Sequence, residues 1–115
     1  MRVLVAGSRT ITDKKLIHDK LNELCDESWT EIVSGGATGP DTIGIEWAKI
    51  KKLKTLVLKP DWGKYGRAAG VIRNTELVDV ADFAVVFWDT ISKGTLDTIK
   101  KLRKTGTEHV VIEVV

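Results

Sequence analysis

The sequence has a single cysteine, Cys25, and therefore cannot form an internal disulfide bond. One cysteine agrees with a reducing compartment, and the neighbours of Cys25 suggest a helix end where the thiol packs without a catalytic role. No stretch approaches the roughly 18 unbroken apolar residues of a membrane-spanning helix. The apolar stretch at the N-terminus is too short for the core of a signal peptide. We therefore expect a soluble, cytoplasmic protein without a membrane partner.

The sequence also has only two histidines and a small net charge. His18 and His109 have no second His or Cys at the spacing of metal ligands, so we expect no metal site and assign no cofactor. The formal net charge of +2 is small for a protein that binds the phosphates of nucleic acid. Basic residues gather at 49–54 and 100–104, and we interpret both runs as solvated helix faces. Nucleic acid is therefore not an expected partner.

Short apolar runs alternate with helical patterns along the chain. The apolar runs predict strands at residues 2–6, 30–34, 55–58, 83–88 and 109–115. Helical spacing of apolar residues predicts helices at residues 12–26, 40–52, 69–80 and 94–104. Thr12 is the expected N-cap of the first helix, and Gly106 suits the end of the last one. Residues 61–70 hold three glycines and predict a long loop.

This alternation predicts an α/β fold. Continuously apolar strands indicate a parallel sheet that is covered on both faces. We expect one Rossmann-like domain over residues 1–115, a three-layer sandwich with a five-stranded parallel sheet. Ligands of such sheets bind outside the carboxyl ends of the strands, near the point where strand order reverses. The loops at 7–10, 35–40, 61–70 and 89–95 all lie at that edge, which makes it the candidate site.

Residues 34–41, Ser-Gly-Gly-Ala-Thr-Gly-Pro-Asp, are the strongest candidate for a phosphate-binding loop. Three glycines in five residues permit positive φ and bring backbone N–H groups close to an anion. Pro40 suits the first position of a helix, whose positive dipole end would face the loop. The alternative is a tight strand-to-helix turn without a ligand. Asp41 either faces the site or only complements the helix dipole.

These loops, taken together, resemble a known family. Its motifs are matched, in order, by Gly7-Ser8-Arg9, by Gly35 to Asp41, by Asp61-Trp62 with Gly70 to Asn74, and by Gly94-Thr95. The resemblance is to the small YspA-like proteins of the SLOG superfamily and covers roughly residues 2–105. That superfamily also contains the phosphoribohydrolases once labelled lysine decarboxylases and the DNA-processing DprA proteins. The resemblance implies a site for a nucleotide or a nucleotide-derived ligand.

The ligand-binding residues that we predict follow from the loops and the resemblance. They are Gly7, Ser8, Arg9, Gly35, Gly36, Ala37, Thr38, Gly39, Asp41, Trp62, Arg73, Asn74, Gly94 and Thr95. The two arginines would supply counter-charge, although Arg9 can instead pair with a neighbouring carboxylate, and Thr95 can instead be an N-cap. Trp62 or Trp88 could stack on a base, whereas the helical spacing of Trp47 indicates a core residue.

The resemblance to the phosphoribohydrolases is incomplete. Thr98 stands where those enzymes carry their catalytic glutamate, and Asp97 lies one residue earlier. Arg73 matches the arginine of their Arg-Lys pair, with Asn74 in place of the lysine. An alternative function is therefore hydrolysis of the N-glycosidic bond of a nucleoside monophosphate, with Asp97 and Arg73 as catalytic candidates and Asp41 as a second carboxylate. A further alternative is an interaction module of the DNA-processing type.

The last predicted strand indicates a homo-oligomer. Residues 110–115 are mostly apolar, and an edge strand exposes unpaired N–H and C=O groups. A second subunit is the usual cover, so a closed dimer is the first expectation. Alternatively, the edge stays short and the fourth helix covers the adjoining face.

Overall fold

The computed structural model describes residues 1–115 and has a five-stranded parallel sheet at its centre. The strands are β1 (Arg2–Gly7), β2 (Glu31–Ser34), β3 (Lys54–Val57), β4 (Phe83–Trp88) and β5 (Glu108–Glu113). They pair in the order β3-β2-β1-β4-β5, and every pairing is parallel. This order reverses between β1 and β4, as in Rossmann-like folds, so the predicted fold class is confirmed.

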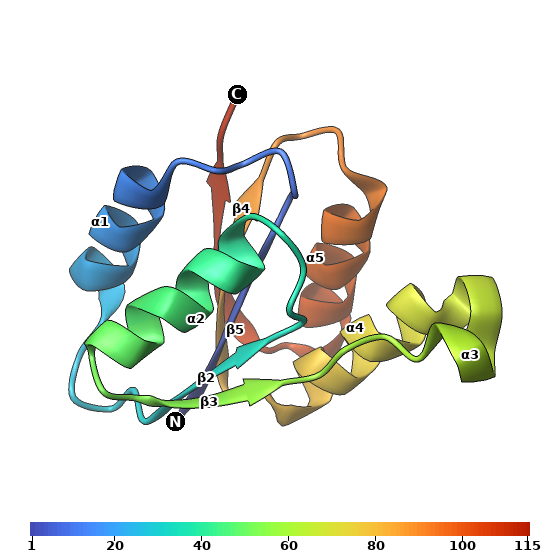
Figure 1. Cartoon of the computed structure of the whole chain (residues 1–115), viewed down its shortest axis with the longest axis horizontal. Coiled ribbons are helices and arrows are strands. Elements are labelled where there is room, and N and C mark those ends of the chain that lie inside the picture. The colour runs from blue at the N-terminus through green and yellow to red at the C-terminus, as the bar shows by residue number, and fades with distance from the viewer.

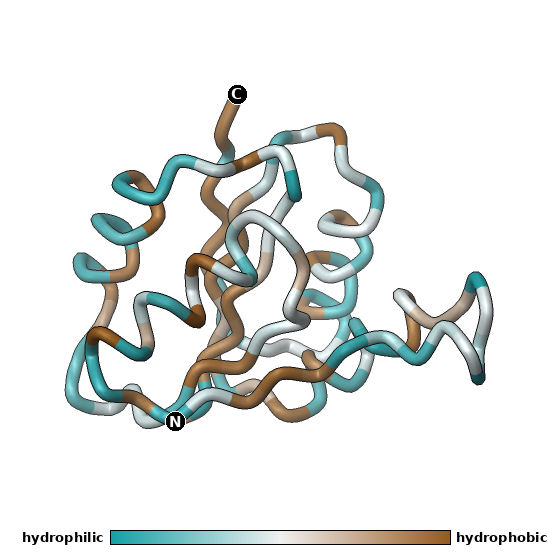
Figure 2. Tube along the Cα trace, in the orientation of Figure 1, coloured by the Kyte–Doolittle hydropathy of each residue, from teal (hydrophilic) through white to brown (hydrophobic).

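Helices cover both faces of the sheet (Figure 1). They are α1 (Lys14–Leu24), α2 (Pro40–Ile50), α4 (Ala69–Val80) and α5 (Lys93–Thr105). Because side chains alternate along a strand, Val3 and Val5 of β1 pack with α1 and α2, whereas Leu4 and Ala6 pack with α4 and α5. Figure 2 shows the apolar residues concentrated along the central strands. The sheet therefore separates two hydrophobic cores.

Polar side chains and glycine set the helix ends. The Oδ1 of Asp13 accepts a hydrogen bond of 3.1 Å from the N–H of Leu16, so Asp13 caps α1 and the expected cap, Thr12, is wrong by one residue. Ser92 precedes α5, which places Thr95 inside the first turn of the helix and not at its cap. Gly106 ends α5 in the left-handed conformation with φ 69°, as predicted.

The largest departure from prediction lies in residues 61–70, which are mostly helical. The Oδ1 of Asp61 accepts a hydrogen bond of 3.0 Å from the N–H of Lys64 and begins the short helix α3 (Trp62–Tyr65). A 3-10 turn, η1 (Gly66–Ala68), connects α3 to α4. The predicted long loop is therefore wrong, because this local cap outweighs the high glycine content. Figure 1 shows α3 projecting away from the sheet.

Strand β5 is an edge strand, as expected, but it is shorter than residues 109–115. Its last residue pairs with Trp88 at the end of β4, and one more bond of 2.8 Å runs from the N–H of Val114 to the Trp88 carbonyl. Beyond that point the neighbouring strand offers no partner. The homo-oligomer stays a prediction.

Three further observations concern membrane-spanning helices, groups of metal-binding side chains and the single cysteine. None of the helices has the length and apolar character that crossing a bilayer requires. No three His, Cys, Asp or Glu side chains lie close enough together to hold a metal ion. Cys25 is half-buried, and burial raises the pKa of its thiol.

Candidate functional site

A cavity of about 480 Å³ opens at the carboxyl edge of the sheet, where strand order reverses between β1 and β4. Its walls come from the end of β1, from the loops after β1, β2 and β4, and from α2, α4 and α5. The lining residues are Ala6, Gly7, Arg9, Thr10, Ala37, Asp41, Arg73, Asn74, Leu77, Asp89, Ile91, Ser92, Gly94, Thr95 and Thr98. This is the place at which α/β sheets bind ligands.

Ser8 joins the loops that follow β1 and β4. Its N–H donates to the carbonyl of Phe87 at 2.9 Å, and its hydroxyl accepts from the N–H of Asp89 at 3.1 Å. The same hydroxyl lies 3.1 Å from the Oγ1 of Thr95. A side chain at Gly7 would place its Cβ 2.5 Å from the Phe87 carbonyl oxygen, so the close approach of the two strands requires glycine there. Ser8 is fully buried, and its hydroxyl holds together Asp89 and Thr95, which line the cavity.

Asp89 shapes the loop at the mouth of the cavity. Its Oδ1 accepts from the N–H groups of Ile91 at 2.9 Å and Ser92 at 2.7 Å, and its Oδ2 accepts from the hydroxyl of Thr10 at 2.8 Å. The hydrogen bonds from Ser92 and Ile91 hold the pKa of Asp89 down to about 2. The loop also keeps Thr90 at φ 70°, a strained conformation for a β-branched residue. Ile91 is 82% exposed at the cavity edge.

The glycine loop after β2 surrounds a carboxylate of the protein itself. The N–H of Ala37 donates to the Oδ2 of Asp41 at 3.2 Å, and the N–H of Gly36 donates to the hydroxyl of Ser34 at 3.2 Å. Gly36 and Gly39 have φ values of 74° and 84°, which L side chains rarely adopt. Two N–H groups that the sequence assigned to a phosphate therefore already have acceptors inside the protein.

Asp41 and Arg73 form the charged wall of the cavity. Asp41 is only 5% exposed, and burial raises its pKa to about 6 against the opposing effects of the Ala37 N–H and the Arg73 guanidinium. The Nη1 of Arg73 donates to the carbonyl of Gly35 at 2.9 Å, and burial lowers the pKa of Arg73. A Cβ on Gly35 would lie 2.5 Å from that Nη1 and 2.9 Å from the Oδ2 of Asp41. Glycine at position 35 therefore leaves room for both charged groups.

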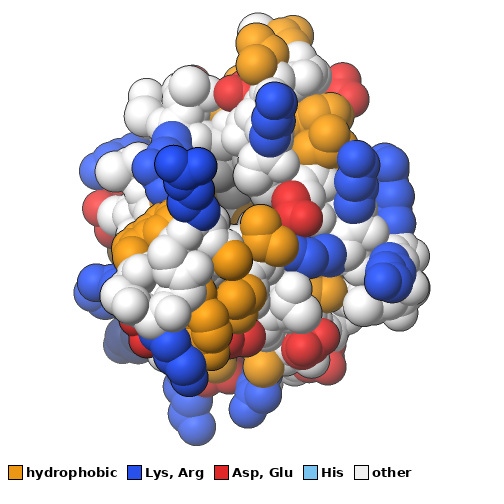
Figure 3. All heavy atoms as spheres, turned by 90° about the vertical axis from the view of Figure 1, so that its right-hand side faces the viewer, with side chains coloured by type: hydrophobic (Ala, Val, Ile, Leu, Met, Phe, Trp, Pro, Cys, Tyr) orange, Lys and Arg blue, Asp and Glu red, His pale blue; other side chains and the backbone are white.

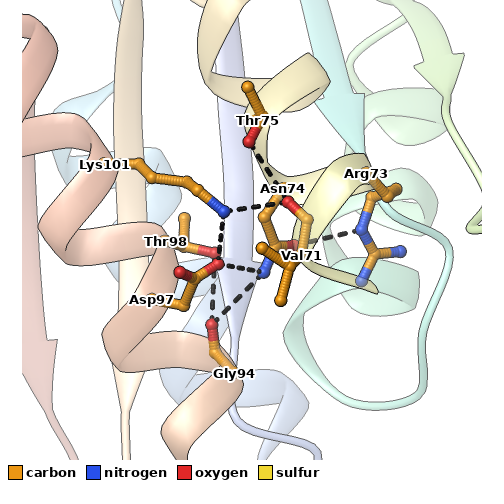
Figure 4. A network of polar contacts seen from close by, with 8 residues as sticks. All are labelled: Val71, Arg73, Asn74, Thr75, Gly94, Asp97, Thr98 and Lys101. Atoms are coloured by element: carbon orange, nitrogen blue, oxygen red, sulfur yellow. Dashed lines mark hydrogen bonds and ion pairs between the residues drawn. The ribbon is translucent and has the colours of Figure 1, made fainter. Parts of the chain in front are cut away.

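Asn74 fixes Arg73 from its other side (Figure 4). The Oδ1 of Asn74 accepts from the Nε of Arg73 at 3.1 Å, and its Nδ2 donates to the Oδ2 of Asp97 at 3.1 Å and to the carbonyl of Gly94 at 3.4 Å. Asp97 in turn pairs with Lys101 at 2.7 Å. This network holds the guanidinium toward the cavity and keeps the Asp97 carboxylate occupied with protein groups.

The first turn of α5 presents free donors. The N–H groups of Lys93, Gly94 and Thr95 have no acceptor within the protein, because helical bonding starts with Leu96 N–H to the Ser92 carbonyl. Gly94 and Thr95 line the cavity, and no atom lies within 4 Å of the position that a Cβ on Gly94 would take. This helix end therefore combines open space, unpaired N–H groups and the positive end of a dipole.

The structure brings together part of the predicted site. The predicted ligand-binding residues that line the cavity are Gly7, Arg9, Ala37, Asp41, Arg73, Asn74, Gly94 and Thr95. Those that do not line it are Ser8, Gly35, Gly36, Thr38, Gly39 and Trp62. Ser8 and Gly35 contact residues that do, whereas Trp62 lies on α3 with 56% of its surface exposed. Their role in binding stays a prediction.

Of the two predicted catalytic residues, one lines the cavity and one does not. Arg73 lines the cavity, whereas Asp97 does not. Thr98, which matches the glutamate position of the phosphoribohydrolases in sequence, also lines it. Asp41 is thus the one carboxylate of the hydrolase hypothesis that reaches the cavity.

The sequence interpretation placed the loops 7–10 and 89–95 at this edge but did not name Thr10, Asp89, Ile91 or Ser92 as site residues, and it missed Ala6 and Leu77. A signal for Asp89 was available in the sequence. It directly follows a strand and lies three residues before Ser92, which precedes a helix.

The parallel sheet and the polar cavity at its reversal point define a Rossmann-like protein with a cavity at the carboxyl edge. The chain belongs to the YspA, cpYpsA-related SLOG family, whose model matches residues 1–65. A curated relative, the Gene 61 protein of Mycobacterium phage D29, is 34% identical over 113 residues and is aligned with 91% of this chain and 90% of its own. The predicted family is confirmed.

Two solved structures share the fold. The match to the DNA processing protein A from Helicobacter pylori covers 100% of this chain and 66% of the Helicobacter chain, with a TM-score of 0.76 and 20% identity. The match to the DNA processing protein A (DprA) from Streptococcus pneumoniae covers 99% of this chain and 50% of the Streptococcus chain, with a TM-score of 0.71 and 20% identity. The chain thus spans less than two thirds of the length of either. The Helicobacter structure concerns a unique single-stranded DNA binding mode.

This similarity corrects the expectation that nucleic acid is not a partner. A protein of the same fold binds single-stranded DNA, so the small net charge does not support that exclusion. The physical reason is that net charge is a sum over the whole molecule, whereas phosphates meet local charge. Arg9 and Arg73 lie together on the cavity. The sequence interpretation assigned these two arginines to a nucleotide and weighed only the lysine-rich helix faces as a surface for nucleic acid.

Proposed function

We propose that the cavity binds a nucleotide or a nucleotide-derived ligand. The observation that carries the proposal is the combination of two guanidinium groups, Arg9 and Arg73, with the unpaired N–H groups of Gly94 and Thr95 around one cavity. Guanidinium groups and helix N-termini are the usual phosphate ligands of proteins. A volume of about 480 Å³ lies within the range of small-molecule sites.

The phosphate of this ligand binds at the N-terminus of α5 and not in the glycine loop. The loop N–H of Ala37 already serves Asp41, and a second anion beside that carboxylate would be repelled. The carboxylate of Asp89 also lies near the start of α5, but it accepts from the N–H groups of Ile91 and Ser92 and leaves those of Lys93, Gly94 and Thr95 without an acceptor. Arg73 reaches the same cavity from α4. Arg9 at the cavity edge completes the counter-charge.

The sugar of the ligand faces Asp41. A carboxylate that lines the cavity accepts hydrogen bonds from hydroxyl groups, which is how acidic residues hold ribose in related α/β folds. Asp41 is mainly ionised above pH 6 because its pKa is about 6. Asp89 is a poorer candidate, since both of its oxygens already accept from protein groups.

A thermal-shift screen over nucleotides, dinucleotides and sugar phosphates tests the proposal. A ligand at 100 times its Kd stabilises the fold by about 2.7 kcal/mol, or about 10 °C for a protein of this size. Arg73→Ala should abolish the shift, whereas Arg103→Ala, an exposed arginine near the other end of α5, should retain it. The proposal fails if no phosphorylated ligand shifts the transition while unphosphorylated sugars or peptides do.

Single-stranded DNA is a second candidate ligand, favoured by the single-stranded DNA binding mode of the Helicobacter pylori protein with the same fold. Fluorescence anisotropy of a labelled oligothymidylate measures it directly. Binding through phosphates should weaken as salt increases, since each neutralised phosphate releases counterions. Anisotropy that does not rise at low salt, at protein concentrations well above micromolar, would contradict this candidate.

A further inference from the structure

A second cavity adjoins the first and shares Arg73 with it. It has a volume of about 230 Å³ and lies between α3 and α4, where Lys59, Lys64, Tyr65 and Ile72 contribute to its walls. Arg73 lines both cavities and is itself held by Gly35 and Asn74. A single fixed guanidinium therefore faces two neighbouring spaces.

Two aromatic side chains stand on α3 beside this second cavity. Trp62 is 56% exposed and Tyr65 is 38% exposed, and neither belongs to a hydrophobic core. The indole of Trp62 packs over Gly70 of α4, since a Cβ there would lie 3.7 Å from the Cη2 of the ring. The Nζ of Lys64 lies 5.1 Å from the centroid of the Tyr65 ring. Each aromatic residue still leaves more than a third of its surface exposed beside the second cavity.

Cationic side chains lie on α3 and in the segments on either side of it. Lys59, Lys64 and Arg67 are exposed, and none of them forms an ion pair with a carboxylate. The second cavity is lined by three cations, Lys59, Lys64 and Arg73, and by two carboxylates, Asp61, which caps α3, and Glu76. Figure 3, which views the molecule from the side of α3, shows lysine, arginine and hydrophobic side chains intermixed on this face. Aromatic rings among cations are the surface that single-stranded nucleic acids bind.

We infer that the second cavity and α3 form a subsite for the next nucleotide of a single-stranded DNA whose first nucleotide occupies the larger cavity. Arg73 contacts the phosphate that links the two nucleotides, because it is the side chain common to both cavities. A base stacks on Trp62 or Tyr65, and Lys59 and Lys64 bind the following phosphate. This inference rests on the proposed function, since it extends the ligand of the larger cavity by one nucleotide.

The test compares a mononucleotide with a short oligothymidylate on the same proteins. Wild type should bind the oligothymidylate at least tenfold more tightly than thymidine monophosphate. The double variant Trp62→Ala/Tyr65→Ala should lose at least tenfold in affinity for the oligothymidylate and less than twofold for the monophosphate. Ile50→Ala, which truncates an exposed apolar side chain on α2, is the matched control and should change neither affinity. Both α3 rings are exposed, and circular dichroism checks that each variant folds.

The outcomes separate the subsite from the proposed function. Monophosphate binding without any gain from a longer strand refutes the subsite alone, as does an oligothymidylate affinity that the α3 double variant leaves unchanged. Strand binding that depends on the α3 rings in the absence of monophosphate binding supports the subsite and refutes mononucleotide binding in the larger cavity. A strand that fails to bind at any salt concentration refutes the subsite.

Discussion

Replacement of Asp41 by asparagine should stabilise the protein at neutral pH. The carboxylate is buried, and its pKa of about 6 lies above the ordinary value of 3.8. Between these two values the folded state binds more protons than the unfolded state, so the free energy of unfolding decreases as pH rises through this window. Asparagine has nearly the same shape and cannot ionise. The free energy of unfolding of the variant therefore lacks this decrease.

The magnitude follows from the two pKa values. At 1.36 kcal/mol per pH unit, the difference between about 6 and 3.8 amounts to about 3 kcal/mol at pH 7. For a protein of this size that is a rise in Tm of about 10 °C. The advantage of Asp41→Asn should be largest above pH 6 and small near pH 4, where the wild-type carboxyl is protonated in the folded state.

Urea unfolding of both proteins from pH 4 to pH 8, followed by tryptophan fluorescence, measures this difference. The comparison isolates Asp41 because all other titrating groups are common to both proteins. A difference in unfolding free energy that is constant across pH 4 to 7, or that favours the wild type as pH rises, would refute the reasoning. A constant difference would mean that Arg73 and the Ala37 N–H cancel the loss of hydration at this carboxylate, and a difference that favours the wild type would mean that they outweigh it.

Asp89→Asn is the matched control with the opposite sign. The pKa of Asp89 is held down to about 2, so its ionised form contributes stability above the ordinary value of 3.8 and loses that contribution as pH falls toward 2. The variant should therefore be less stable than wild type at pH 7, and the two should converge in strong acid. Equal stabilities at pH 7 would show that the hydrogen bonds to Asp89 add nothing.

The remaining predictions concern the glycine loop and the core. Gly35→Ala should lower ligand affinity at least tenfold in calorimetric titrations, because its Cβ would lie 2.5 Å from the Nη1 of Arg73; Gly63→Ala, with no contact closer than 3.7 Å, should leave affinity unchanged. Asn22→Ala should lower the free energy of unfolding by about 1 kcal/mol, since it leaves the Nε1 of the buried Trp47 without its acceptor at 2.9 Å. An unchanged urea midpoint would contradict this second expectation.

The parts of the fold that depend on local sequence could be predicted well. Strand β4 was predicted residue for residue, because a continuous apolar run lies between Asp82 and Asp89. Helix α4 was likewise predicted at both ends. Helix α3 was missed because one capping bond from Asp61 decides its structure, while glycine content dominates the pattern of the segment.

The candidate site was predictable only in outline. Residues in the loops after strands, such as Arg9 after β1 and Ala37 after β2, could be assigned to the carboxyl edge because parallel strands end together. The charge that faces Asp41 comes from α4, which brings Arg73 against the glycine loop 38 residues away from Gly35. No local pattern contains that contact. The hydrogen bond from Thr10 to Asp89 likewise joins two loops whose residues are 79 positions apart in the sequence.

The bonds of Ser8 and Asp89 have a consequence for binding kinetics. They connect the loops after β1 and β4 to each other and to the start of α5 through protein groups alone. The mouth of the larger cavity is therefore preorganised, and a ligand needs to order little backbone when it enters. Association should then be a single step with a rate proportional to ligand concentration, without the slow conformational phase of sites that close over their ligands.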